Sequence, residues 1–318
     1  MSNNINTTSG NSTTQERKVI ILAGATGNLG KRIADFLVKK NTIVKAIVRR
    51  ESTSKEIVSL REKGVSIFES DFNNISELSR ACSGGNCIIS ALSGLREVIV
   101  DLQFKLVKAA VEAGVPRFIP SDFSIDFTQL SAGTNRNLDF RREFSERLEK
   151  EPVSATSILN GMFMELLPVE AHIILKGIKR IMYWGDADQP MDFTTINDTA
   201  RFTAEAALDT TTPRYLKIAG EVTSIRGLKK IVTEVYENKF GLMRLGGLGV
   251  LKNMIKLTRL MSPNNNELYP PWQGMQYLHN MLSGKPKLEP LDNERYPEIK
   301  WTSIRDILSK YILKECKK

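Results

Sequence analysis

The chain has few of the residues that build metal centres and disulfide frameworks. Its 318 residues include three cysteines, Cys82, Cys87 and Cys316, and two histidines, His172 and His279. The cysteines lack metal-ligand spacing, and two histidines give poor support for a histidine-based metal site or a Ser-His-Asp triad. We therefore expect no bound metal. So few cysteines are typical of a reducing compartment, and we expect a cytoplasmic protein.

The sequence also lacks a hydrophobic run long enough to span a bilayer, so we expect no membrane partner. Residues 1–16 are polar and contain no apolar segment of the kind found in signal peptides, so they predict a disordered tail. The whole chain is 41% hydrophobic. This length and composition suffice for one large α/β domain, with or without a smaller lobe.

Acidic residues are outnumbered by basic ones, 36 to 45, which gives a net charge of +9. Part of the excess lies in residues 225–260, which contain eight Lys or Arg and only two Glu. This segment is interpreted either as a solvated basic face or as a surface for an acidic partner or nucleic acid. No helix-turn-helix, zinc-finger or RNA-binding motif accompanies it, and we expect no nucleic-acid partner.

A glycine loop at residues 24–30 is the most informative stretch of the chain. It follows the apolar run 19–23 and leads into a helical pattern of apolar residues. A strand, a glycine turn and a helix N-terminus together predict a phosphate cradle, although a tight turn without a ligand has the same pattern. Ala25 and Arg32 exclude a Walker A loop. The predicted cradle residues are Gly24, Thr26, Gly27, Asn28, Leu29 and Gly30.

Strand-like and helix-like segments alternate through the first half of the chain. The predicted strands are 17–23, 42–48, 64–69, 86–90 and 117–120, and the helices between them lie near 28–40, 53–63, 74–82 and 95–114. Five such repeats predict an α/β fold with a doubly wound parallel Rossmann sheet. A further helix near 137–150 leads to another strand at 154–159.

Beyond about residue 160 the alternation becomes irregular, which predicts a smaller C-terminal lobe on the substrate side. We expect a dinucleotide-binding Rossmann domain over 17–165 and a lobe over 166–318 that interleaves with the sheet. Residues 262–275 predict a loop that covers a cleft. Its predicted apolar anchor is Tyr269, Pro270, Pro271 and Trp272.

The end of the second predicted strand has no acidic residue. NAD-specific Rossmann proteins place Asp or Glu there to bond the ribose 2′-hydroxyl. Here Val48 is followed by Arg49 and Arg50, and a guanidinium can hold a 2′-phosphate with two parallel hydrogen bonds. The sequence therefore predicts NADP(H), with Arg49 as the chief contact and Arg50 beside it. The alternative is a surface arginine at a strand end.

Two further strand ends supply candidate cofactor contacts. Asp71 and Phe72 follow the third strand, where many of these folds receive the adenine. Ala91 and Leu92 follow the fourth strand, where the chain passes the pyrophosphate and ribose.

Several motifs together resemble one family. They are GATGNLGKRI at 24–33, VRR at 48–50, SDF at 70–72, ISALSG at 89–94 and VPRFIPSDF at 115–123. The last is similar to a segment of the isoflavone-reductase and NmrA-like proteins, which are atypical short-chain dehydrogenases/reductases. The resemblance covers about residues 17–165 and continues loosely through 193–200, where Asp198 fits a helix start.

The resemblance implies a two-lobed fold with NADP(H) across the carboxyl edge of the strands. Reductases of this family act on phenylpropanoid, lignan or related aromatic substrates, whereas the NmrA type senses the dinucleotide and acts through a protein partner. The family lines its nicotinamide pocket after the sixth strand. Those positions are Asn160, Gly161, Met162 and Phe163, of which Met162 and Phe163 fit the core equally well.

The family's catalytic lysine position is occupied here by Arg141. Arginine effectively cannot lose its proton, so Arg141 is expected to bind the cofactor or to stabilise a developing oxyanion. No Tyr-x-x-x-Lys pair appears in this region. Ser121, Asp122 and Tyr183 are the candidate proton donors.

The helix around Arg141 suggests which way this side chain faces. Arg142 and Glu146, like Glu143 and Arg147, are spaced for i,i+4 ion pairs, whereas Arg141 has no acidic residue at that distance. Arg141 therefore faces either the cleft or solvent. The leading hypothesis is an oxidoreductase that transfers hydride from NADPH to a small aromatic or apolar carbonyl or enone. The alternative is a catalytically weak NADP(H) sensor that acts through a protein partner.

Overall fold

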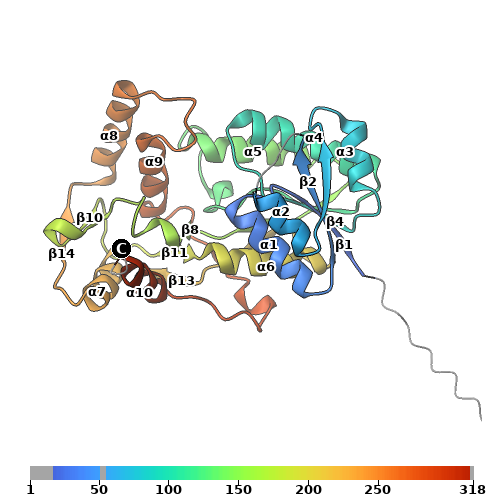
Figure 1. Ribbon diagram of the computed structural model, residues 1–318. Coiled ribbons are helices and arrows are strands. Elements are labelled where there is room, and N and C mark those ends of the chain that lie inside the picture. Colours follow the sequence, from blue (N-terminus) through green and yellow to red (C-terminus); the bar gives the residue numbers. More distant parts are fainter. Residues whose placement is uncertain (1–16, 51–54, 316–318) are drawn as a thin grey trace, which may run out of the picture.

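A computed structural model describes residues 17–50 and 55–315, so the predicted tail at 1–16 and Cys316 lie outside the described residues (Figure 1). Its centre is a parallel sheet of six strands in the order β3-β2-β1-β4-β5-β6. This order confirms the predicted doubly wound Rossmann sheet. The strands are β1 (Val19–Ala23), β2 (Ile43–Arg49), β3 (Ser66–Ser70), β4 (Cys87–Ser90), β5 (Arg117–Ile119) and β6 (Ser154–Ala155).

Helices cover both faces of this sheet (Figure 1). One layer contains α1 (Asn28–Lys39), α2 (Lys55–Glu62) and α6 (Ile196–Leu208). The other contains α3 (Ile75–Cys82), α4 (Gln103–Glu112) and α5 (Arg136–Leu148), with a π-helical turn, η1 (Glu97–Leu102), before α4. The central strand β1 is continuously apolar because both of its faces are covered. In β1, Ile20 and Leu22 join one buried cluster, and Ile21 and Ala23 join the other.

The chain returns to this half of the molecule after residue 165. Strand β7 (Ser157–Leu159) pairs in parallel with β12 (Tyr215–Lys217), and α6 packs against α1. Thr195 caps α6 by accepting a hydrogen bond from the backbone N–H of Asp198, which places Asp198 in the first turn as expected. The domain boundary near residue 165 stays a prediction.

The remaining elements form the C-terminal part of the molecule around a separate buried cluster (Figure 1). Its strands are β8 (Met162–Phe163), β9 (Ile174–Leu175), β10 (Arg180–Tyr183), β11 (Met191–Thr194), β13 (Glu221–Thr223) and β14 (Gly241–Arg244). Its helices are α7 (Ile225–Val235), α8 (Leu248–Met261), α9 (Pro271–Leu282) and α10 (Ile304–Glu315). Short 3-10 turns are η2 (Phe127–Gln129), η3 (Met164–Leu166), η4 (Lys176–Ile178) and η5 (Asn293–Arg295). Within the described residues, no helix is long and apolar enough to cross a bilayer.

The prediction of a loop over 262–275 was wrong for its last five residues. The loop stops at Pro270, and α9 begins at Pro271, because proline is well suited to the first position of a helix. Of the predicted anchor, Trp272 and Pro270 are buried, whereas Tyr269 and Pro271 are exposed.

Trp272 anchors this loop through a hydrogen bond and two cation–π contacts. Its Nε1 donates a hydrogen bond to the carbonyl oxygen of Pro263 at 3.1 Å. The guanidinium groups of Arg136 and Arg259 lie 4.7 and 4.9 Å from the ring centroid. These cation–π contacts join α5 and α8 to the start of α9.

Candidate functional site

The glycine loop forms a close-packed turn at the carboxyl end of β1. Gly24 has φ +80°, and a Cβ there would lie 2.4 Å from the carbonyl oxygen of Ala91. A Cβ at Gly30 would lie 2.1 Å from the carbonyl oxygen of Gly24. Only glycine fits these two positions, because the loop packs against the end of β4 and the first turn of α1 packs against the loop.

The N-terminus of α1 is open toward this edge of the sheet. Gly27 is its cap residue and is exposed with Asn28, and no side chain in the described residues caps the helix there. Thr26 and Leu29 are half-buried beside them. The free N–H groups and the helix dipole therefore favour an anion at this position.

The two arginines after β2 have different surroundings. Arg50 forms an ion pair with Glu77 at 2.5 Å. Arg49 is exposed and has no hydrogen bond or ion pair with any residue that the structure describes. The guanidinium of Arg49 is thus available to a ligand, whereas that of Arg50 is already paired.

The ends of β3 and β4 lie along the same edge. Asp71 is half-buried, and its carboxylate accepts a hydrogen bond from the backbone of Asn73 at 2.8 Å. Phe72 is buried in the core beside α3 and α4. Ala91 and Leu92 are half-buried. Because Ala91 touches the glycine loop, the structure brings the β1 and β4 contacts together.

The predicted donors Ser121 and Asp122 are both buried after β5. The Ser121 hydroxyl donates to the carbonyl oxygen of Leu92 at 2.6 Å, so it ties this loop to the end of β4. The Asp122 carboxylate accepts a hydrogen bond from the Ser157 hydroxyl at 2.6 Å. Burial raises the pKa of Asp122, and the Ser157 hydrogen bond and the charge of Arg141 oppose that shift.

Arg141 is half-buried on α5 and lies near Asp122. Its Nη1 donates to the backbone oxygen of Asn137 at 3.0 Å, whereas its buried Nε has no partner among the described residues. Helix α5 itself supplies no acidic partner, as predicted. A guanidinium with an unpaired N–H near a buried carboxylate can hold a negative charge on a ligand.

Of the two ion pairs predicted along α5, one is present in the structure and the other is not. Glu143 pairs with Arg147 at 2.7 Å, as predicted. The predicted pair of Arg142 with Glu146 was wrong, because Arg142 pairs with Asp139 at 2.9 Å. Arg142 also donates to carbonyl oxygens of the neighbouring turn η2, which only the tertiary structure places there.

Helix α9 packs against the N-terminal end of α5 through a buried polar network. Gln273 donates to the Asn135 side chain at 2.7 Å, and Asn135 donates to Asn280 at 3.2 Å. The backbone N–H of Arg136 donates to the Gln276 side chain at 3.2 Å. Residues 273, 276 and 280 share one face of α9, which is therefore held toward α5.

Tyr277 lies on this face and was missed by the sequence analysis. Its hydroxyl has no hydrogen-bond partner among the described residues. Burial raises the pKa of Tyr277 to about 12, and the charges of Arg141 and Arg136 oppose the shift. No local motif connects Tyr277 with Arg141, because only the packing of α9 on α5 brings them together.

By contrast, the predicted donor Tyr183 lies elsewhere. It ends β10, in the sheet formed with β9 and β14. The pKa of Arg226 is raised mainly by Asp188 and to a lesser degree by Tyr183, so Tyr183 lies near Arg226. The structure does not bring Tyr183 together with Arg141.

The four residues after β7 begin with a buried amide. Asn160 is fully buried, and neither polar atom of its side chain has a partner in the described part of the chain. Gly161 has φ +67°, and a Cβ there would lie 2.3 Å from the carbonyl oxygen of Asp192. Met162 and Phe163 are half-buried in β8. An unpaired buried amide at the carboxyl end of a strand suits a polar ligand group.

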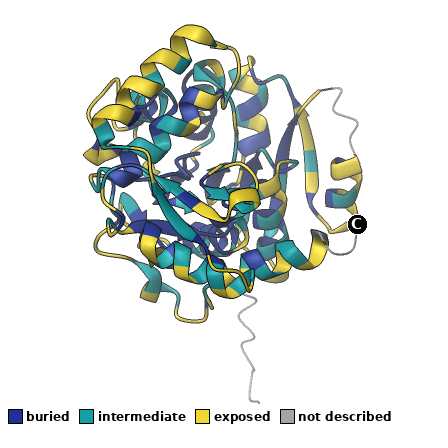
Figure 2. Cartoon of the chain, turned by 90° about the vertical axis from the view of Figure 1, so that its left-hand side faces the viewer, coloured by how far each residue is buried: buried dark blue, intermediate teal, exposed yellow. Residues whose placement is uncertain are grey.

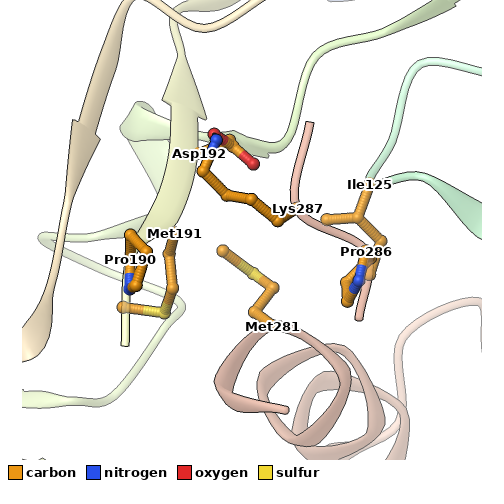
Figure 3. A pocket seen from close by; sticks show the side chains of 7 residues that line it. All are labelled: Ile125, Pro190, Met191, Asp192, Met281, Pro286 and Lys287. Atoms are coloured by element: carbon orange, nitrogen blue, oxygen red, sulfur yellow. The ribbon is translucent and has the colours of Figure 1, made fainter. Parts of the chain in front are cut away.

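A narrow pocket lies between Ile125, β11 and the end of α9 (Figure 3). Asp192 and Lys287 form a buried ion pair of 2.6 Å at its wall, and Met281 faces them. It has room for about one water molecule. It is therefore too small for an aromatic substrate.

The residues at the carboxyl edge of the six-stranded sheet, with Asn160 after the neighbouring strand β7, fit a dinucleotide. The glycine cradle and the open N-terminus of α1 suit a pyrophosphate, the free guanidinium of Arg49 suits a further phosphate, and the Asn160 amide suits a carboxamide. Doubly wound sheets bind dinucleotides at this edge.

Comparisons with known proteins agree with this fold and with NADP(H) as the cofactor. The chain is 26% identical to the bifunctional pinoresinol-lariciresinol reductase of Linum perenne, with 92% of this chain and 98% of the relative covered. It is 24% identical to isoflavone reductase homolog P3 of Arabidopsis thaliana, with the same coverage of both chains.

Two solved structures share the fold. One is described as "AtPrR2 with NADP+ and (+)pinoresinol"; its TM-score is 0.76 at 20% identity, covering 93% of this chain and 99% of the other. The second is leucoanthocyanidin reductase with NADPH from Vitis vinifera, with a TM-score of 0.78 at 18% identity and the same coverage. The sequence model of the NmrA-like family matches residues 16–272, which confirms the resemblance seen in the motifs. The chain belongs to the NmrA-like family.

Proposed function

We propose that this protein is an NADPH-dependent reductase of a small aromatic substrate. The observation that carries the proposal is the glycine cradle followed by the unpaired guanidinium of Arg49, which together suit the pyrophosphate and 2′-phosphate of NADP(H). The relatives named above are reductases, and one solved neighbour holds NADP+ with pinoresinol. These names favour an enzyme over the regulatory alternative.

The chemistry of the site requires both charge stabilisation and a proton. When bound, NADPH supplies hydride to the substrate carbon. Arg141 stabilises the negative charge that develops on the substrate oxygen but keeps its own proton. Tyr277, whose hydroxyl has no hydrogen-bond partner among the described residues and whose pKa responds to the charge of Arg141, is the proposed proton donor. Ser121 holds the loop after β4 through Leu92.

We also infer that the protein works in a reducing, cytoplasmic environment. Cys82 and Cys87 are buried free thiols, and burial raises the pKa of each to about 12. Thiols of this kind are protonated and unreactive at neutral pH.

The proposed function is tested by following NADPH oxidation against a panel of pinoresinol, aromatic enones and aromatic aldehydes. Binding of NADPH is measured separately by fluorescence titration. We expect tight NADPH binding and turnover with at least one member of the panel. Tight binding without turnover of any member would favour the sensor, and absence of NADPH binding would contradict both functions.

Cofactor choice is tested at Arg49. We expect Arg49→Asp to weaken NADPH binding by about 10- to 100-fold and to leave NADH binding nearly unchanged, because only NADPH carries the 2′-phosphate. Arg50→Gln is the matched control, since Arg50 is paired with Glu77. An unchanged preference for NADPH in Arg49→Asp would remove Arg49 from the site.

A further inference from the structure

Helix α8 has two apolar faces, and only one of them is covered. Leu248, Leu251 and Ile255 pack into the C-terminal core. A second set lies on the outer side, where spacings of four, three and four residues align side chains on one face. The outer set is Val250, Met254, Leu257 and Met261, with exposed fractions of 46%, 36%, 58% and 77%, flanked by Leu260 at 80%.

Only basic charges accompany this outer face. Lys252, Lys256 and Arg259 are exposed on α8, and the sequence contains no acidic residue between Glu237 and Glu267. Lys252 and Lys256 have no ion pair with any described residue. Lys252, Lys256 and Leu260 follow one another at spacings of four residues along α8, so these two cations of the basic segment border the exposed apolar face.

The position of α8 leaves this face accessible. The helix forms the outer margin of the C-terminal part in Figure 1. Figure 2 views the molecule from that side and shows exposed residues gathered along its upper edge. An exposed apolar stripe of this kind marks an interaction site.

The basic residues of α8 indicate which kind of partner can cover its exposed apolar face. A symmetric pair of copies would place the same basic face of α8 on both sides of the interface, and the like charges would repel. A surface of anionic lipids offers negative charge to the lysines and an apolar layer to the leucines and methionines. Helices with this division of side chains lie in the plane of the membrane interface and need no spanning segment.

We propose that the outer face of α8 docks this protein on membrane surfaces that contain anionic lipids. Leu257, Leu260 and Met261 enter the boundary between headgroups and acyl chains, and Lys252 and Lys256 contact lipid phosphates. The expectation of no membrane partner rested on the lack of a spanning helix, which this mode of binding does not require.

Vesicle flotation of the full chain tests the proposal. The probes are phosphatidylcholine vesicles with and without phosphatidylserine, at low and high salt. We expect binding only to the phosphatidylserine vesicles, weakened by salt. We expect Leu257→Asp with Leu260→Asp, and separately Lys252→Glu with Lys256→Glu, to lower binding at least about tenfold.

Leu313→Asp is the matched control, because Leu313 is 62% exposed on a different helix, α10. It should float like the wild type, and all variants should retain NADPH binding and the circular dichroism spectrum of the fold. Failure of the wild type to float, or equal flotation of the α8 variants, would overturn the proposal. A wild-type dimer that the α8 aspartates dissociate, without vesicle binding, would assign the face to a second copy instead.

Discussion

Replacing Gly24 with alanine is expected to lower the affinity for NADPH at least about 100-fold, equivalent to about 3 kcal/mol of binding free energy. Gly24 has φ +80°, and the new Cβ would lie 2.4 Å from the carbonyl oxygen of Ala91. Neither the new Cβ nor the Ala91 carbonyl belongs to a flexible side chain that could turn aside, so the glycine loop itself must move away from β4. The movement shifts the backbone N–H groups that are proposed to hold the pyrophosphate.

Two further variants separate loss of binding from loss of the fold. Gly84 has φ +72°, but a Cβ there would meet no atom within 4 Å. Gly84→Ala should therefore cost about 1–2 kcal/mol of stability without changing NADPH affinity. Gly27→Ala should keep the fold, since Gly27 has negative φ. It should nevertheless weaken NADPH binding about tenfold, because it places a methyl group where the phosphates are proposed to bind.

Fluorescence titration and thermal unfolding measure these effects. Wild-type affinity in both Gly24→Ala and Gly27→Ala would show that the cofactor lies elsewhere.

The second large effect is expected at Tyr277. Tyr277→Phe should lower kcat by about 10²- to 10⁴-fold, because it removes the proton that Tyr277 is proposed to supply to the substrate oxygen. The dissociation constant for NADPH should not change. Because the pKa of Tyr277 is raised to about 12, the hydroxyl stays protonated, and wild-type kcat should not fall as pH rises to about 9 through loss of this proton.

Steady-state kinetics on the substrate found in the panel measure this effect. Tyr183→Phe is the control and should be nearly unaffected, since Tyr183 ends β10 in another sheet. A lysine can lose a proton where arginine cannot, so Arg141→Lys in the Tyr277→Phe background should recover part of the lost kcat. Full activity in Tyr277→Phe would exclude it as the donor.

The first half of the fold could be predicted from the sequence because its signals are local. The apolar run of β1, the glycine spacing and the periodicity of α1 lie within about twenty consecutive residues, and each supports the same strand-turn-helix unit. Repetition of this unit implies the doubly wound sheet, because parallel strands need a helical crossover between them. The exposed position of Arg49 at the end of β2 follows from the same pattern.

Other features depended on contacts between residues far apart in the chain. Arg142 bonds to Asp139 and to turn η2 rather than to Glu146, because that turn is folded against α5. The loop after α8 is shorter than predicted, because Pro271 begins helix α9 instead of continuing the loop.

The sequence by itself determined the glycine turn before α1, the arginine at the end of β2 and the family, because each depends on residues that are neighbours in the chain. The tertiary structure alone decided which tyrosine lies on the helix that packs against the start of α5 and which apolar face of α8 remains uncovered. Tyr277 meets α5 only through the polar network of Asn135, Gln273 and Asn280. The two faces of α8 have similar composition, and only the packing of the C-terminal core covers one of them.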